Sequence, residues 1–453
     1  MYFWRLFGRK GSATGTRPSP IWEFFLPHQS GLPDKPNTAW GNIADFNRDG
    51  LADLIVGADR ENRVYLYHGD PTGKPAPAGS VGWSGLGVYF GDQLSAADIN
   101  GDGWTDVVVG PDQADAGSGR VLVYLNDQGS VPASPTQTLS GKDPAGLFGV
   151  HAAVGDFDGD GYGDVAISAN GAEVAPNLRG KVFLHRGGPG GLESNPIAVL
   201  LSGTDGRLGF SIAAAGDVNG DGYADMLIGT YGADASYVCY GGAVPPPSGP
   251  IDACTRCTKI VGPDGGQFGY SVGGAGDVNG DSYADVLVGA LAWNGHTGRA
   301  YLYLGGKAGV QTSPAHMMTG TAKEGAFGHR VSGAGDIDGD GFADVIIGQP
   351  SYLPTAPERG RAFVYRGGTG GLDSPPVEIG SPNPSVKVFF GMSVTGVGDL
   401  DGDGRSEVAV AAPEPPAPLM PAVHLYRWPG PQTVGMLEGP VGSHFGVNIA
   451  RTY

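Results

Sequence analysis

The sequence predicts an all-β fold, a seven-bladed β-propeller of four-stranded antiparallel blades with calcium-binding loops. Three observations predict it. Short β-branched and aromatic runs of period two recur along the chain, and no helical periodicity appears beside them. An acidic loop recurs at intervals of 53 to 63 residues, with its first aspartate at positions 45, 98, 156, 217, 277, 336 and 399. Repeats of this length with four short strands each are typical of propeller blades.

Each repeat has the same order of elements, which the fifth repeat illustrates. A small-residue strand, FGYSVGGAG (268–276), leads into the acidic loop, and a β-branched run, DVLVGA (285–290), leaves it. An aromatic strand of period two follows, GRAYLYLGG (298–306), and then a fourth apolar stretch, AHMMTG (315–320). An apolar–glycine step opens the repeats after the first, at Phe90-Gly91, Phe148-Gly149, Leu208-Gly209, Phe268-Gly269, Phe327-Gly328 and Phe390-Gly391.

The acidic loops carry side-chain oxygens at positions 1, 3, 5 and 9. Calcium prefers six to eight oxygen ligands in a flexible geometry, and alternate positions of a loop can turn toward one centre. Position 7 is expected to offer its backbone carbonyl. The predicted ligands are Asp45, Asn47, Asp49, Leu51 and Asp53; Asp98, Asn100, Asp102, Trp104 and Asp106; Asp156, Asp158, Asp160, Tyr162 and Asp164; Asp217, Asn219, Asp221, Tyr223 and Asp225; Asp277, Asn279, Asp281, Tyr283 and Asp285; Asp336, Asp338, Asp340, Phe342 and Asp344; and Asp399, Asp401, Asp403, Arg405 and Glu407.

Position 12 distinguishes these loops from EF-hands. An EF-hand places a bidentate glutamate there, whereas these loops have Val56, Val109, Ile167, Ile228, Val288, Ile347 and Val410. A strand is therefore expected to follow each loop. Three or four carboxylates in one short loop repel one another without a cation, and up to seven Ca²⁺ would offset most of the net charge of −18. Magnesium fits less well, because it demands a stricter octahedral geometry.

The repeat resembles a known family. The FG step, the acidic loop and strand ends such as Gly57-Ala58, Gly289-Ala290 and Ala412-Pro413 are similar to FG-GAP repeats, the repeats of the integrin α-subunit β-propeller. The resemblance covers about residues 37–453. It implies a calcium-stabilised propeller that acts in adhesion or protein interaction, and it implies that one terminus donates a strand to the blade begun by the other.

Residues 1–19 are predicted to form a flexible N-terminal segment, and residues 20–453 a single propeller. Two segments could close it. Either IWEFF (21–25) completes the last blade, or HFGVNI (444–449) completes the first.

Charge and composition restrict the partners. The net charge of −18 argues against nucleic acid, and no apolar run approaches the roughly 18 residues of a membrane span. We expect a monomeric propeller whose protein or glycan ligand the sequence does not identify. Calcium loops of this type suit an extracellular, cell-surface or periplasmic setting. The N-terminal stretch MYFWRLFGRKGSATG lacks the order of a signal peptide, so a truncated start or an unrecognised export signal is expected.

No catalytic residue is predicted. The stretch GYSVG (269–273) matches a nucleophile elbow, but GFSIA and GMSVT stand at the same place in other repeats, so the serine is expected to belong to a strand. The predicted function is therefore a non-catalytic adhesion or protein-interaction module. Two alternatives remain open: a calcium-containing, lectin-like carbohydrate-binding propeller, and an accessory propeller of a secreted hydrolase system. The second follows from the phospholipase D family specific for glycosylphosphatidylinositol, which also carries FG-GAP repeats.

Three features depart from the repeat. Ser282 stands at loop position 6, where the six other loops have glycine, and a left-handed backbone there would cost about 1 kcal/mol. The fifth loop is therefore expected to be among the weaker calcium sites. The long loop 241–259 is a candidate interaction surface or a tolerated insertion. Cys239, Cys254 and Cys257 favour a local disulfide or free thiols over a zinc site, which needs more ligands.

Overall fold

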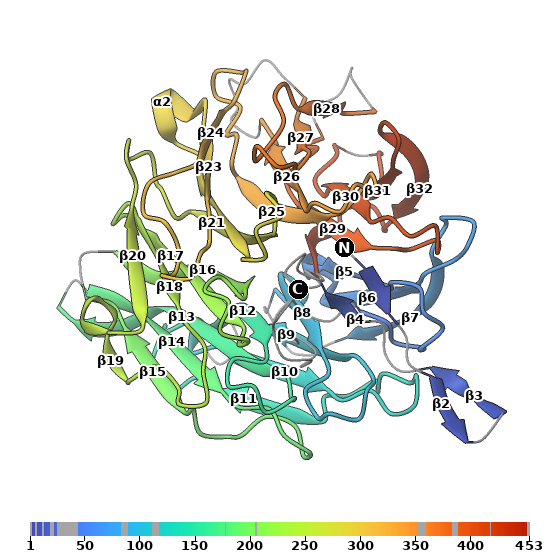
Figure 1. Cartoon of the computed structure of the whole chain (residues 1–453), viewed down its shortest axis with the longest axis horizontal. Coiled ribbons are helices and arrows are strands. Elements are labelled where there is room, and N and C mark those ends of the chain that lie inside the picture. Colours follow the sequence, from blue (N-terminus) through green and yellow to red (C-terminus); the bar gives the residue numbers. More distant parts are fainter. Residues whose placement is uncertain are drawn as a thin grey trace.

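The computed structural model describes residues 44–82, 89–110, 117–176, 178–203, 206–351, 359–382, 388–416 and 418–450, together with the backbone of four short N-terminal strands. Antiparallel sheets lie around a common centre, as expected of a β-propeller (Figure 1). Their inner strands contact one another in chain order around that centre. The all-β prediction is confirmed.

Five sheets have four strands each. One has the order β33-β5-β6-β7 and another β8-β9-β10-β11; the other three are β21 to β24, β25 to β28 and β29 to β32. The bounds are β5 (Leu54–Ala58), β6 (Arg63–His68), β7 (Ala76–Gly82), β8 (Gln93–Ala97), β9 (Asp106–Gly110), β10 (Arg120–Tyr124), β11 (Gln137–Ser140), β21 (Ser271–Gly276), β22 (Asp285–Ala290), β23 (Arg299–Tyr303), β24 (His316–Thr319), β25 (Arg330–Gly335), β26 (Asp344–Gln349), β27 (Arg361–Tyr365), β28 (Val377–Gly380), β29 (Val394–Gly398), β30 (Glu407–Ala412), β31 (Ala422–Arg427), β32 (Gln432–Glu438) and β33 (Phe445–Ile449).

The third and fourth repeats share one nine-stranded sheet. Its main path is β12-β13-β14-β16-β17-β18-β20, and β15 pairs with β14 and β19. The bounds are β12 (Phe148–Gly155), β13 (Asp164–Ala175), β14 (Leu178–His185), β15 (Ala198–Leu201), β16 (Arg207–Gly216), β17 (Asp225–Tyr231), β18 (Ala235–Cys239), β19 (Gly249–Pro250) and β20 (Cys257–Val261). Short helical turns are η2 (Asp59–Glu61), η3 (Ile251–Ala253) and α2 (Trp293–His296).

The prediction of seven separate four-stranded blades is therefore wrong. Within the described residues there are five four-stranded blades and one nine-stranded sheet. The cause is the length of the strands in the third and fourth repeats, where β13 has 12 residues and β16 has 10. The start of β16 reaches β14, and the two pair in parallel at Arg179 and Arg207. The strands β15 and β19 join in the same way at Leu200 and Gly249.

The C-terminal strand closes the propeller. In β33, Phe445 lies opposite Ala58 and Ile449 opposite Val56, both in β5. HFGVNI therefore completes the first sheet, which is one of the two predicted closures. The segment IWEFF contains β4 (Trp22–Phe24), which pairs with β1 (Tyr2–Trp4) and not with a blade. The strands β2 (Phe7–Lys10) and β3 (Ala13–Pro18) pair with each other.

The FG step packs one repeat against the sheet before it. Its apolar side chain is at most 5% exposed in all seven copies, including Phe445. Its glycine has a positive φ in each copy, 88° at Gly269, and the Gly269 carbonyl lies so close to Gly229 of β17 that a Cβ on Gly229 would come within 2.2 Å of it. Apolar clusters fill the spaces between neighbouring sheets, with β-branched side chains from both sides. Burial of these apolar clusters stabilises the packing of neighbouring sheets.

Candidate metal-binding loops

Each acidic loop leads directly into the second strand of its blade. The side chain at position 12 is fully buried in that strand in all seven repeats, as at Val288 of β22. No helix follows a loop within the described residues. The prediction that these are strand-joining loops, and not EF-hands, is confirmed.

The loops share one internal hydrogen-bond pattern, which the fifth loop illustrates. The carboxylate of Asp277, at position 1, accepts the N–H of Ser282, at position 6, at 2.7 Å. The carboxylate of Asp281, at position 5, accepts the N–H of Tyr283, at position 7, at 3.1 Å. Both bonds recur in all seven loops, at 2.7–3.1 Å and 2.8–3.1 Å. The sequence spacing therefore sets the loop conformation through its own acids.

The acid at position 9 joins the loop to the third strand of its sheet. Asp285 accepts the N–H of Val278 at 3.0 Å with one oxygen and the N–H of Gly305 at 2.9 Å with the other. The first bond exists in all seven loops and the second in six of them. In the seventh loop Glu407 accepts the N–H of Leu400 at 2.7 Å, but its buried Oε1 has no hydrogen-bond partner among the described protein groups.

Burial makes these acids hard to ionise without a cation. Desolvation is the main cause that raises the pKa of Asp106 to about 7, of Asp164, Asp225 and Asp344 to about 8, and of Glu407 to about 9. The neighbouring carboxylates of the same loop raise these pKa values further. A cation held among them would stabilise the ionised forms.

Three loops bring their acids at positions 1, 3 and 9 together. Within each group, oxygen atoms of all three side chains lie within 4.8 Å of one another: Asp156, Asp158 and Asp164; Asp336, Asp338 and Asp344; and Asp399, Asp401 and Glu407. The acids at position 5 lie outside these groups, and the other four loops have asparagine at position 3. Hard oxygen donors, and the unpartnered oxygen of Glu407, fit Ca²⁺ in their chemistry. The full set of 35 predicted ligands remains a prediction.

Three arginines near these loops were missed in the sequence analysis. Arg186 pairs with Asp158, Arg366 with Asp338 at 3.3 Å, and Arg427 with Asp401 at 3.1 Å. Each arginine lies at the end of the third strand, and each pairs with an acid at position 3. The four loops with asparagine at position 3 have no arginine at that place but His68, Leu125, Tyr240 and Leu304.

The arginines balance the charge of the loops. Four acids with one arginine at the strand end, or three acids without one, both give a formal charge of −3; Arg48 in the first loop and Arg405 in the seventh bring those two loops to −2. The signal was present in the sequence as the joint occurrence of aspartate at position 3 and arginine about 28 residues later.

Position 6 needs a left-handed backbone, as the comparison of the loops had suggested. Ser282 has φ 73°, and the six glycines at that position have φ between 83° and 94°. Serine therefore occupies a conformation that glycine adopts at lower cost.

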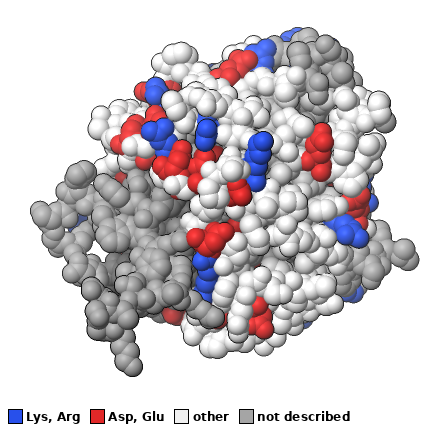
Figure 2. All heavy atoms as spheres, turned by 90° about the vertical axis from the view of Figure 1, so that its right-hand side faces the viewer, with Lys and Arg blue, Asp and Glu red and all other residues white. Residues whose placement is uncertain are grey.

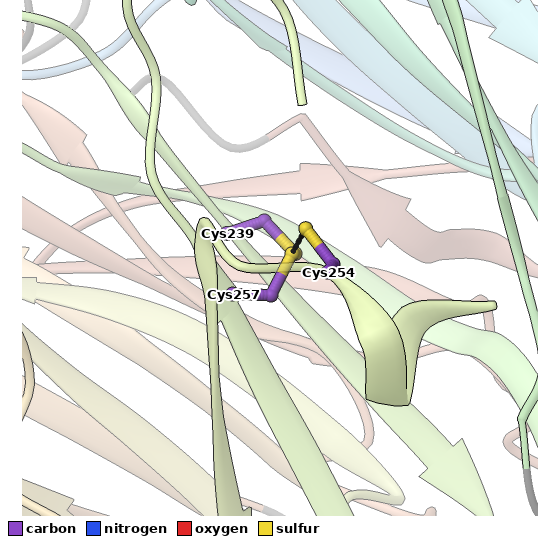
Figure 3. Close-up of side chains that lie close together, drawn as sticks. All are labelled: Cys239, Cys254 and Cys257. Atoms are coloured by element: carbon purple, nitrogen blue, oxygen red, sulfur yellow. Dashed lines mark hydrogen bonds between the residues drawn. A yellow bond between two sulfur atoms is a disulfide. The ribbon is translucent and has the colours of Figure 1, made fainter. Parts of the chain in front are cut away.

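The serine of GYSVG is a strand residue. Ser271 belongs to β21, is buried, and its hydroxyl donates to the carbonyl of Gly328 at 2.8 Å. The predicted interaction loop 241–259 contains η3 and most of β20. Near it, Cys239 and Cys257 form a disulfide, and Cys254 is a buried thiol (Figure 3).

Charged side chains of both signs are interspersed on the side of the molecule shown in Figure 2. Among the described residues, no helix has the length and apolar character needed to cross a membrane.

Comparison with known proteins decides the family. The FG-GAP-like repeat family matches residues 45–109, 98–167, 277–347 and 336–410, more than half of the chain, and the FG-GAP repeat matches residues 208–245. The chain belongs to the FG-GAP repeat family. Its loops and FG steps are those of this family's repeats, as the sequence analysis had indicated.

Integrin α subunits are among the curated relatives of this FG-GAP repeat protein. It is 35% identical over 216 residues to integrin alpha-5 of Xenopus laevis, covering 44% of this chain and 20% of that protein. It is 37% identical over 161 residues to integrin alpha-IIb of Homo sapiens, covering 33% of this chain and 15% of that protein. The matches thus span a fifth or less of these relatives' length. The solved structure of the Dos1 propeller aligns with 82% of this chain and 75% of its own, at a TM-score of 0.43 and 13% identity.

Proposed function

We propose that this FG-GAP propeller is a non-catalytic, calcium-stabilised module for adhesion or protein interaction that acts extracellularly, at the cell surface or in a periplasm. One observation carries the proposal: seven loops place buried acids around a common pattern of backbone hydrogen bonds, and Glu407 buries a carboxylate oxygen without a partner. The integrin α relatives support the adhesion role. We propose residues 20–453 as the extent of the propeller.

The proposed ligands are the side chains at positions 1, 3, 5 and 9 and the carbonyl at position 7 of each loop, for up to seven ions. Burial raises the pKa of the acids at position 9, and the positive charge of a bound Ca²⁺ would stabilise their ionised forms. The role of the residues themselves is structural. They hold the turn between the first two strands, and position 9 ties that turn to the end of the third strand.

The aromatic side chains at position 7 argue against a sugar platform. Tyr162, Tyr223, Tyr283 and Phe342 each pack against a glycine of the preceding loop, so part of each ring is already in contact with the protein. The lectin-like alternative therefore has less support than the protein-interaction module. No observation favours the accessory hydrolase role.

Thermal unfolding with and without calcium tests the metal proposal. We expect a chelator to lower the melting temperature and added calcium to restore it, because a ligand present at 100 times its Kd stabilises the native state by about 2.7 kcal/mol per site. Asp281→Ala removes one ligand and should reduce the number of ions measured by equilibrium dialysis. Asp127→Asn, an exposed acid outside the loops, is the matched control and should retain them all. An unchanged melting temperature in strong chelator would refute the proposal.

The interaction role requires a separate test. The immobilised propeller should retain a protein from its native extracellular milieu in calcium, and release it in chelator. Tight binding of a glycan on an array, with one glycan bound per repeat, would instead favour the lectin-like alternative.

A further inference from the structure

We propose that the seven loops form one closed circle in which calcium binding at one loop raises the affinity of its neighbours. This inference rests on the proposed calcium function and goes beyond it, because independent sites would serve structural stabilisation equally well. It is carried by two sets of contacts between loops of successive repeats.

The first set is a chain of backbone hydrogen bonds. The residue at position 8 of a loop donates its N–H to the carbonyl of position 1 in the preceding loop, at 2.8–3.1 Å. Six junctions have this bond: Gly163 to Asp98, Ala224 to Asp156, Ala284 to Asp217, Ala343 to Asp277, Ser406 to Asp336, and Ala52 to Asp399. At the seventh junction the Thr105 hydroxyl makes the contact instead: it accepts the N–H of Asp45 at 3.1 Å and donates to the Asp45 carbonyl at 3.5 Å.

The second set is packing of the position 7 side chain on position 4 of the preceding loop. Position 4 is a glycine with positive φ in six loops, and four of these glycines face an aromatic ring. A Cβ on any of those four would lie 2.5–2.7 Å from a ring carbon, so only glycine fits. The pairs are Tyr162 on Gly101, Tyr223 on Gly159, Tyr283 on Gly220, and Phe342 on Gly280.

The remaining three junctions keep the contact with other side chains. Arg405 lies against Gly339 and Leu51 against Gly402. In the first loop position 4 is Arg48, whose guanidinium lies 4.2 Å from the centre of the Trp104 ring. Because Leu51 and Ala52 of the first loop contact the seventh, the series has no free end.

These contacts link the predicted ligands of neighbouring sites directly. The residue that donates, at position 8, lies between two predicted ligands of its own loop, those at positions 7 and 9. The carbonyl that accepts belongs to the predicted ligand at position 1 of the preceding loop. An ion that orders one loop therefore fixes backbone that the next loop would otherwise have to order when it binds. Ordering shared in this way gives positive cooperativity, and couplings of about 5- to 150-fold are usual between linked sites.

One junction is weaker than the others. In five repeats a second N–H, just after the third strand, donates to the position 2 carbonyl of the preceding loop, as Gly306 does to Val218 at 2.9 Å. In the second repeat the side-chain amide of Asn126 makes this contact instead and donates to the carbonyl of Phe46 at 2.9 Å. In the seventh repeat the equivalent residue is Pro429, which has no N–H to donate. The coupling between the sixth and seventh loops should be the weakest in the circle.

Native mass spectrometry of the full chain across a calcium titration tests the proposal. At half saturation we expect nearly empty and nearly full molecules to outnumber those with three or four ions. A distribution that follows independent binding would overturn the coupling but leave calcium binding intact. Failure to bind any calcium would instead refute the proposed function itself, so the two failures are distinguishable.

Tyr283→Ala separates coupling from ligation. The variant retains the position 7 carbonyl and every ligand side chain, and removes only the ring that covers Gly220 of the fourth loop. We expect the same maximum number of ions, a lower Hill coefficient and a half-saturation concentration raised several-fold. Tyr89→Ala, a tyrosine 43% exposed outside the loops, should behave as the unaltered chain. A Tyr283→Ala titration with an unchanged Hill coefficient would contradict the coupling.

A separate observation concerns the cysteines, and we infer that Cys254 exchanges into the Cys239–Cys257 disulfide. The Sγ of Cys254 lies 2.7 Å from that of Cys257, and the three sulfurs lie within 4.8 Å of one another (Figure 3). Cys239 of β18 and Cys257 of β20 are directly opposite in the sheet, whereas Cys254 follows η3 on the segment that leads into β20.

The exchange needs no oxidant. The Cys254 thiol loses its proton, and its thiolate attacks the sulfur of Cys257. A Cys254–Cys257 bond forms, the Cys239–Cys257 bond breaks, and its electron pair leaves on the sulfur of Cys239, which takes up a proton. The product confines the disulfide to the CTRC segment and removes the covalent link between β18 and β20. Burial raises the pKa of the Cys254 thiol, so the exchange should be faster in alkali than at neutral pH.

Disulfide mapping tests this exchange. After equilibration at alkaline pH, an acid quench and non-reducing digestion, we expect peptides with the 239–257 bond and peptides with the 254–257 bond. Cys254→Ser should give only the 239–257 bond, and Cys239→Ser from oxidising conditions only the 254–257 bond. Detection of the 239–257 bond alone in the unaltered chain would overturn the inference.

Discussion

Ser282 shows how a single residue can weaken one loop without breaking it. We predict that Ser282→Gly stabilises the protein, because a left-handed non-glycine residue costs roughly 1–2 kcal/mol and the entropy of the new glycine offsets about 0.5–1 kcal/mol of that. The net gain should be below about 1 kcal/mol in denaturant unfolding, with tighter calcium binding at the fifth loop. Gly222→Ser in the fourth loop is the reverse exchange at an equivalent site and should lose a similar amount. A loss of stability in Ser282→Gly would disprove the strain.

His329 gives a pH dependence at the scale of one residue. Burial lowers the pKa of His329 to about 3, and its imidazole packs beside Tyr270 with ring centres 5.6 Å apart. Below about pH 6.5 the unfolded chain binds a proton that the folded chain does not, so the unfolding free energy falls as pH falls. The contribution of this residue is about 1.4 kcal/mol per pH unit between roughly pH 6 and 4.

The variant His329→Gln should therefore show a smaller loss of stability on acidification, measured by denaturant unfolding at several pH values. The carboxylates contribute equally to both proteins and cancel in the difference. His296→Gln, at a half-exposed position, is the control and should retain the slope of the unaltered chain. Parallel pH profiles for His329→Gln and the unaltered chain would contradict the assignment.

At the scale of the loop, an acid at position 3 is balanced by an arginine at the end of the third strand. Asp158 is 5% and Arg186 33% exposed at their side chains, so their ion pair is partly screened. We predict that Arg186→Leu destabilises the calcium-free protein, because the third loop then holds four acids without their cation, and that it tightens calcium binding there. Asp158→Asn with Arg186→Leu restores the Asn100 and Leu125 pattern of the second repeat and should recover much of the lost stability.

A double-mutant cycle by thermal unfolding in chelator measures this coupling, which should be about 1 kcal/mol or less. Arg179→Leu, at the start of β14 and away from the loops, controls for the loss of a charge. Additive effects of the two substitutions would show that the pair does not balance the loop.

The strands and loops were largely predictable because the same sequence pattern recurs seven times. The buried residue at position 12, the loop turn and the FG step all follow from local spacing, which the backbone hydrogen bonds then satisfy. The nine-stranded sheet was not predictable from the repeat. It depends on how far β13 and β16 extend away from their loops, because the parallel pairings Arg179–Arg207 and Leu200–Gly249 then join the two repeats in one sheet. Isolated parallel bridges also link neighbouring repeats at Gly119–Phe148, Gly298–Phe327 and Gly360–Phe390, but there the strands are shorter and the sheets stay separate. The arginine partners were encoded, but only as a correlation between distant positions.

For the whole molecule, closure depends on a strand from the far end of the sequence. Phe445 of β33 is fully buried, and its ring centre lies 5.5 Å from that of Tyr65 and 6.3 Å from that of Tyr67 in β6. Next to it, His444 lies 3.1 Å from Asp59 and 2.8 Å from Glu414. His444 therefore contacts both Asp59 of the first repeat and Glu414 of the seventh, and with Phe445 it joins the two ends of the circle of sheets.

We therefore predict that Phe445→Ala and Phe327→Ala, which both alter an FG step, differ in which strands they loosen. Both Phe445→Ala and the matched Phe327→Ala remove a buried FG ring and should cost about 3–5 kcal/mol. Only Phe445→Ala should loosen β33 from β5, because no loop of the chain ties these strands together, whereas Phe327 lies between strands that are already connected in sequence. Amide hydrogen exchange should accelerate in β5 and β33 for Phe445→Ala, and only around β22 to β25 for Phe327→Ala. Equal, global acceleration in both variants would show that the seam is no weaker than the joints between successive repeats.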